Sequence, residues 1–134
     1  MGIRQWQAIG LLSTIALAGC GSTYSPSGGG GGGGGGNGDP MAVSVGNDFF
    51  RSGQDGSANP AVNRVAVGQT VTWTWGNTGA VSHSVHSVGA TTFPSSTILS
   101  GSGTAYQVTF QTAGTYHYNC AVHGDLMSGT VIVE

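Results

Sequence analysis

Charged side chains are scarce in this sequence of 134 residues, and one kind is missing entirely. Only 6% of the residues are charged, against about 25% in an average protein. There is no lysine, and lysine and arginine together number three, so the chain lacks the basic surface with which proteins bind nucleic acid. The low charge also excludes a disordered polyelectrolyte and a charged helical or coiled-coil protein.

Long apolar runs are also absent, because the run at residues 8–18 has eleven residues and a membrane-spanning helix needs about 20. This run follows the positive charge of Arg4 and has the length of a signal-peptide core. It ends in LAGC at residues 17–20, which resembles the bacterial lipobox, where the chain is cut before a cysteine that receives lipid. We therefore predict a lipoprotein signal peptide at residues 1–19 and lipidation of Cys20. An ordinary secretory signal followed by a chance cysteine is the alternative.

Glycine is concentrated in one stretch, since nine of the 26 glycines follow one another at residues 28–36. Glycine maximises backbone freedom and buries no side chain, so this stretch cannot contribute to a core. We predict that residues 20–40 are a lipid-anchored cysteine and a flexible tether, and that residues 41–134 form one folded domain. The tether either lets the domain swing above a membrane to meet partners or is a neutral spacer.

The predicted domain consists of short alternating segments separated by Gly, Asn and Pro. The clearest is residues 70–75, where Val71, Trp73 and Trp75 face one side and three threonines face the other. No window shows sustained helical periodicity, and about eight short strands predict an all-β, antiparallel Greek-key β-sandwich. The expected strands are residues 42–45, 64–67, 70–75, 82–88, 106–110, 115–120 and 129–133. The expected large core side chains are Trp73, Trp75, Phe110, Tyr116 and Tyr118.

Sulfur and imidazole groups gather near the end of the chain. Cys120, His123 and Met127 lie within eight residues, between one predicted strand and the next. Taken singly, they would be a buried small residue, a surface histidine and a core methionine. Together they predict a metal site, because Cys and Met sulfur select copper or other soft metals and imidazole suits copper. Two histidines, one cysteine and a weak axial methionine make the blue-copper arrangement, so a second histidine is required.

Three other histidines compete for that remaining position. Strand alternation places His83 on the face of Val81 and Val85, which we expect to be the core face, and His86 on the opposite face. His117 lies out of phase with the cysteine on its own predicted strand and therefore points away from the metal. We predict His83 as the second histidine ligand. His86 or His117 would replace it only if a β-bulge shifted the register.

Three segments carry a resemblance to a known family. Residues 114–123, GTYHYNCAVH, and residues 127–133, MSGTVIV, resemble the C-terminal signature of the cupredoxins, particularly the plastocyanin/azurin-like group. Upstream, WGN at residues 75–77 followed by HSV at residues 83–85 resembles the family segment that carries the first histidine. The resemblance implies an eight-stranded sandwich that holds one type 1 copper ion. The implied copper ligands are His83, Cys120, His123 and Met127.

The sequence departs from the family pattern at two places. Three residues separate His123 from Met127, whereas plastocyanins typically have four and amicyanins two. Ser84 stands directly after the first histidine, where many members have an asparagine that helps to tie the ligand loops together. A serine hydroxyl can still form a hydrogen bond at this position.

These ligands predict a one-electron carrier at the cell envelope, attached to a membrane by its lipid, with the domain in the periplasm or another extracytoplasmic space. Its partners would be redox proteins that meet the exposed edge of His123, and we expect a monomer that binds no nucleic acid. We do not expect an enzyme, because four coordinating side chains leave no open position for a substrate. The alternatives are a copper-binding or storage lipoprotein without electron transfer, and a metal-free sandwich for adhesion.

Overall fold

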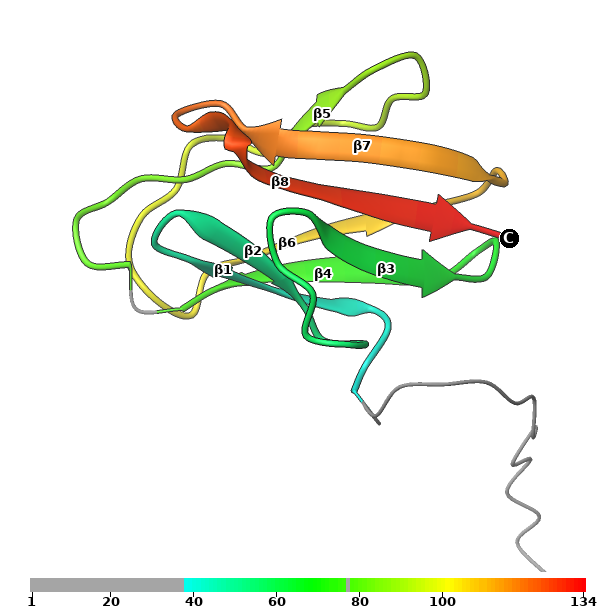
Figure 1. Ribbon diagram of the computed structural model, residues 1–134, viewed down its shortest axis with the longest axis horizontal. Helices are drawn as coiled ribbons and strands as arrows, with labels where there is room; N and C mark the ends of the chain where they lie inside the picture. Colours follow the sequence, from blue (N-terminus) through cyan, green and yellow to red (C-terminus); the bar gives the residue numbers. More distant parts are fainter. Residues whose placement is uncertain (1–37, 77) are drawn as a thin grey trace, which may run out of the picture. The chain divides into compact units, whose positions relative to one another are not determined.

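The computed structural model describes residues 38–76 and 78–134, which form two facing β-sheets (Figure 1). The predicted signal peptide, Cys20 and most of the predicted tether lie outside the described residues. The predicted boundaries after residues 19 and 40 therefore stay predictions. Within the described ranges no helix is long and apolar enough to cross a membrane.

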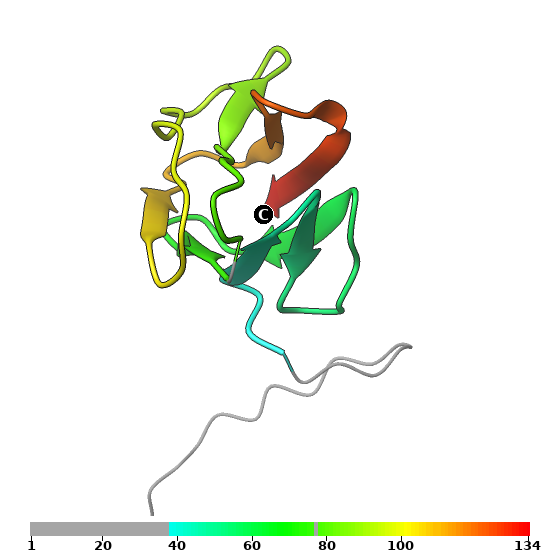
Figure 2. The same ribbon diagram turned by 90° about the vertical axis from the view of Figure 1, so that its left-hand side faces the viewer.

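Eight strands make up the described domain, which confirms the prediction of an all-β sandwich with about eight strands. The strands are β1 (Ala42–Gly46), β2 (Phe49–Ser52), β3 (Ala61–Val65), β4 (Thr70–Trp75), β5 (His86–Val88), β6 (Ala105–Thr109), β7 (Gly114–Cys120) and β8 (Gly124–Val133). One sheet has the order β2-β1-β4-β6 and the other the order β3-β8-β7-β5. Figures 1 and 2 show these sheets as two layers that face each other.

Two strand pairs run parallel, so the expectation of a purely antiparallel sandwich is wrong in this respect. β1 is parallel to β4, and β3 is parallel to β8, whereas the other four pairs are antiparallel. Parallel neighbours cannot be joined by a tight hairpin. The chain instead changes sheet between β2 and β3 and again between β3 and β4, so that each layer combines segments distant in sequence.

Local alternation predicts some strand positions well and others poorly. β4 occupies the predicted residues, but β3 begins three residues before the predicted segment 64–67 and overlaps only its first two residues. β2 is not among the predicted strands, and β8 begins at Gly124, five residues before the predicted start. The largest error concerns residues 82–88, of which only the last three form a strand, β5.

The core between the sheets is rich in aromatic rings, and all five large side chains predicted for it are buried. The Tyr118 ring meets Trp73 edge-on at 5.3 Å between centroids and Phe50 at 4.9 Å. Such aromatic pairs stabilise a fold beyond the area that they bury. Burial raises the pKa of the Tyr118 hydroxyl, because a phenolate would lose its hydration. Tyr118 lies two residues before Cys120 on β7, so this cluster anchors the strand that carries the cysteine.

The Tyr118 ring leaves no room for a side chain at Gly129, its partner on β8. A Cβ atom added at Gly129 would overlap the tyrosine ring. We expect Gly129→Ala to lower the free energy of unfolding by about 1–3 kcal/mol, the usual effect of overpacking a core. Chemical denaturation measures this difference.

Gly76→Ala is the matched control, because its added Cβ would meet only the carbonyl oxygen of Val45, at an ordinary 3.5 Å. This variant should stay within about 0.5 kcal/mol of the parent chain. Equal stabilities of the two variants would contradict the tight packing of Tyr118 on Gly129.

Candidate metal centre

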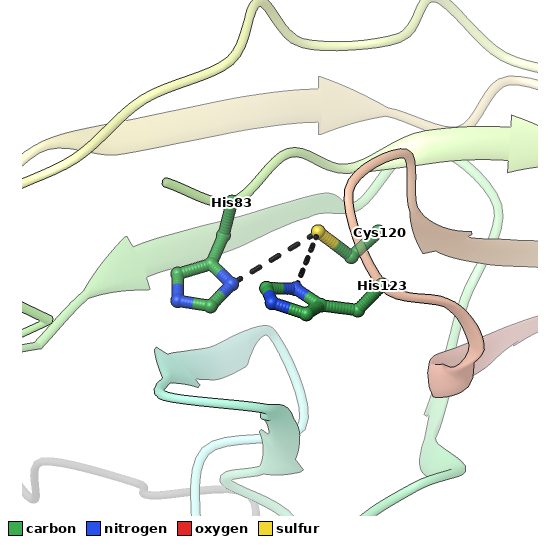
Figure 3. A group of neighbouring side chains, drawn as sticks. All are labelled: His83, Cys120 and His123. Atoms are coloured by element: carbon green, nitrogen blue, oxygen red, sulfur yellow. Dashed lines mark hydrogen bonds between the residues drawn. The ribbon is translucent and has the colours of Figure 1, made fainter. Parts of the chain in front are cut away.

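Three of the four predicted ligands converge at one end of the sandwich (Figure 3). The Cys120 Sγ atom lies 3.4 Å from Nδ1 of His123 and 3.9 Å from Nδ1 of His83. All three possible ligand atoms lie within 4.8 Å of one another. Nitrogen and sulfur ligands about 2.0–2.3 Å from an ion in a trigonal plane would be roughly 3.5–4 Å apart. The spacing of these side chains therefore fits a single metal ion.

Cys120 is the last residue of β7, and the chain reverses direction immediately after it. The His123 amide donates a hydrogen bond to the Cys120 carbonyl at 3.2 Å, which closes the turn. Gly124 follows with φ 61°, a left-handed conformation that glycine adopts without strain. This tight turn brings His123 back beside the cysteine. The Cys120 side chain itself is completely buried and forms no disulfide.

A bulge in β8 follows this turn and determines where Met127 lies. Asn119 of β7 pairs with Ser128, whereas the next residue, Cys120, pairs with Gly124, so three residues of β8 have no partner on β7. Met127, the last of these three residues, is completely buried and lies in phase with the buried residues that alternate along the rest of β8. Met127 thus faces the interior of the sandwich. Its role as axial ligand stays a prediction.

His83 comes from the connection between β4 and β5, not from a strand as the alternation predicts. It forms a single bridge with Leu99, in which each amide donates to the other residue's carbonyl at 2.8 Å. Val81, expected on the same core face, is 39% exposed, whereas His83 is completely buried. His83 is therefore the histidine that reaches the cysteine, although the strand that predicts it does not exist over residues 82–85.

Ser84 is buried beside the cysteine, whereas alternation places it on the opposite face with His86. Residues 83–85 are all buried, which a strand with one solvent-facing side does not allow. The Ser84 backbone amide donates a hydrogen bond to Cys120 Sγ at 3.4 Å. The Ser84 hydroxyl accepts a hydrogen bond from the Ala121 backbone amide at 3.0 Å. Ser84 thus ties the His83 segment to the Cys120 turn.

The two rejected histidines lie outside this group. His86 and His117 are both exposed. A ring nitrogen of His86 lies 3.4 Å from the Asn119 side chain, and one of His117 lies 3.1 Å from the Thr130 hydroxyl. Both side chains thus contact polar groups on the outer face of the sheet that contains β7.

Two residues outside the predicted set complete the surroundings of the ligands. Asn47 Oδ1 lies 3.3 Å from Nε2 of His83, and Asp48 Oδ1 lies 3.2 Å from Nε2 of His123. Both residues belong to the turn between β1 and β2, two strands of the sheet that does not contain Cys120. In a sequence, an Asn-Asp pair predicts only a turn. No sequence pattern therefore indicates these contacts with the histidines.

The environment of His83 favours its neutral form. Burial lowers the pKa of His83 below its usual value, and the proximity of His123 lowers it further. A lowered pKa favours the uncharged ring. A neutral imidazole is the form that binds a metal ion.

Comparisons with known proteins agree with this donor set. Residues 52–134 match the family described as copper binding proteins, plastocyanin/azurin family. No curated protein sequence matches the chain.

Several solved structures are similar to this chain. An oxidised amicyanin variant with methionine replaced by leucine is 28% identical, with a TM-score of 0.55, covering 71% of this chain and 82% of its own. The reduced Cu(I) form at pH 4 of another amicyanin variant, with proline replaced by glycine, is 30% identical, with a TM-score of 0.53 and coverages of 70% and 81%. A purple cupredoxin from Nitrosopumilus maritimus is 29% identical, with a TM-score of 0.50 and coverages of 59% and 83%.

The cofactor follows from the family match and the donor set together. A cysteine sulfur and two imidazoles suit one copper ion. The match extends over more than half of the chain, from Ser52 at the end of β2 to residue 134. The chain belongs to the plastocyanin/azurin family of copper-binding proteins.

Proposed function

We propose that this protein carries single electrons at the cell envelope, with a type 1 copper ion held by His83, Cys120 and His123 and by Met127 as the axial ligand. The observation that carries the proposal is the convergence of one buried sulfur and two imidazole nitrogens within 4.8 Å. Two histidines and a cysteine with a weak axial methionine are typical of blue-copper electron-transfer sites. Membership of the plastocyanin/azurin family supports the same activity.

The chain's contribution is to hold the donor atoms still. When bound, copper supplies a one-electron couple between Cu(I) and Cu(II). The His83 segment is held by its bridge to Leu99. On the other ligand segment, the side-chain amide of Asn119 donates a hydrogen bond to the Asp125 carboxylate in the β8 bulge at 2.8 Å. Because both ligand segments are tied to the sandwich, the donors move little when the charge of the site changes. Small movements keep the barrier to electron transfer low.

His123 provides the contact with solvent. Its side chain is 25% exposed, and it lies in the turn between Val122, which is 50% exposed, and Leu126, which is 85% exposed. Redox partners form weak complexes that bury less than about 1,200 Å². A small apolar rim beside an exposed ligand suits such brief encounters. With four protein ligands the site has no open position for a substrate, so we propose a carrier and not an enzyme.

Copper binding by the full chain tests the proposal directly. We expect one equivalent of Cu(II) to produce an intense visible sulfur-to-copper band and narrow copper hyperfine splitting in electron paramagnetic resonance. Cys120→Ser removes the thiolate and should abolish the band, whereas Ser44→Ala, at an exposed position of β1, should keep it. A band that survives Cys120→Ser would contradict the assignment.

Stopped-flow redox cycling of the same copper-loaded chain separates a carrier from a storage protein. Rapid reduction and reoxidation by one-electron reagents is expected of a carrier. A site that exchanges electrons only slowly would favour storage.

The choice among the histidines is tested by removing them one at a time. His83→Ala should bleach or alter the visible band, because it removes one of the nitrogen atoms that converge on the sulfur. His86→Ala and His117→Ala should leave the band unchanged, because both side chains lie on the outer face of the sheet. Absorption spectra of the three copper-loaded variants decide this. Loss of the band in His86→Ala together with its retention in His83→Ala would refute the ligand set.

We also propose that lipid on Cys20 holds the domain at a membrane. The lipobox-like sequence after the apolar run at residues 8–18 supports this, and two or more acyl chains anchor a protein stably. In a bacterial host we expect the parent chain to partition with membranes and Cys20→Ser to appear in the soluble fraction. Cys120→Ser, the matched control, should stay with the membranes. A membrane-bound Cys20→Ser chain would argue against the anchor.

A further inference from the structure

The two imidazole rings lie between the cysteine and the turn that joins β1 to β2. Their Nδ1 atoms face Cys120 Sγ at 3.4 and 3.9 Å. Their Nε2 atoms face side-chain oxygens of the turn, with His83 beside Asn47 at 3.3 Å and His123 beside Asp48 at 3.2 Å. Figure 3 shows the two rings side by side, each with one nitrogen directed at the sulfur. Each ring is thus contacted at both of its nitrogens.

The turn is itself held in place by the fold. Asp48 has φ 64°, a left-handed conformation that is uncommon for residues other than glycine and is tolerated best by Asn and Asp. The Asn59 side chain donates to the Asp48 carbonyl at 2.7 Å and accepts from the Phe50 amide at 3.2 Å. An unusual backbone conformation fixed by its neighbours is a recurrent feature of functional sites.

We propose that Asn47 and Asp48 are positioning residues for the two histidine ligands, an inference that rests on the proposed function. A neutral imidazole carries one N–H, and an acceptor at one ring nitrogen decides where that hydrogen resides. Oxygen acceptors at both Nε2 atoms keep the hydrogens there and leave both Nδ1 lone pairs directed at the metal position. Partners of this kind orient metal ligands in proteins generally.

The two acceptors differ in charge, and this difference affects the reduction potential of the site. The amide of Asn47 is neutral and contacts the completely buried ring of His83. The carboxylate of Asp48 is 74% exposed and contacts the partly exposed ring of His123. A negative charge this close favours the more positive, oxidised state of the site. Asp48 therefore lowers the reduction potential and lies at the edge through which electrons would pass.

The positioning role is tested first on the metal-free full chain. Histidine side-chain ¹H–¹⁵N correlation spectra distinguish the two neutral tautomers, and we expect the Nε2–H form for both His83 and His123. Asp48→Ala should produce a mixture of tautomers at His123 and leave His83 unchanged, whereas Asn47→Ala should do the reverse. An Nδ1–H tautomer in the parent chain, or a His123 signal unmoved by Asp48→Ala, would overturn the proposal.

The charge effect is tested on the copper-loaded chain with Asp48→Asn, which keeps an acceptor oxygen and suits the left-handed backbone. This variant should keep the His123 tautomer and raise the equilibrium constant for reduction by up to about tenfold, which corresponds to about 59 mV for one electron.

Asp55→Asn, the matched control, removes one negative charge from an exposed loop position and should leave the potential unchanged. Equal potentials in the parent chain and Asp48→Asn would overturn the charge role. Failure of the parent chain to bind copper would refute the proposed function, while the tautomers of the metal-free chain would still decide the positioning role.

Discussion

The burial of one sulfur atom is the constraint on which this site depends. Cys120 is completely enclosed at the end of β7, and polar groups reach its sulfur from two separate connections of the chain. The Ser84 amide and the His83 ring come from the connection between β4 and β5, and the His123 ring comes from the β7–β8 turn. A sulfur surrounded in this way suits a soft metal ion, because thiolates are preferred ligands of copper.

The packing of the core explains why the sulfur stays where it is. Tyr118 precedes Cys120 by two residues, faces the same interior, and is packed edge-on against Trp73 and Phe50. Its ring also occupies the space above Gly129 on the neighbouring strand. β7 therefore ends at a well-defined place, and the turn that follows starts from there. The opposite layer adds the β1–β2 turn, which contacts the far nitrogens of both rings.

Sequence patterns predict the part of the site that is local along the chain. Cys120 and His123 lie in one tight turn, so their spacing alone indicates a shared ligand, and β4 follows its alternation along its whole length. Alternation predicts His83 only through a strand at residues 82–85 that does not form. The position of His83 depends instead on its bridge to Leu99, which alternation does not predict. Asn47 and Asp48 reach the rings across the sandwich, and the parallel pairs join strands distant in sequence. Such contacts depend on the whole topology, which no local pattern encodes.

We expect the folded chain to hold its one sulfur and two nitrogen donors in place before the metal arrives. Crystal structures of the metal-free and Cu(II)-loaded protein, determined from the same crystal form, test this most directly. Cys120, His83 and His123 should keep their side-chain rotamers, and the ion should lie between Sγ and the two Nδ1 atoms, with atomic shifts of about a few tenths of an ångström. A copper ion bound elsewhere, or a ligand turn that refolds around the ion, would show that the donors are not held in place beforehand.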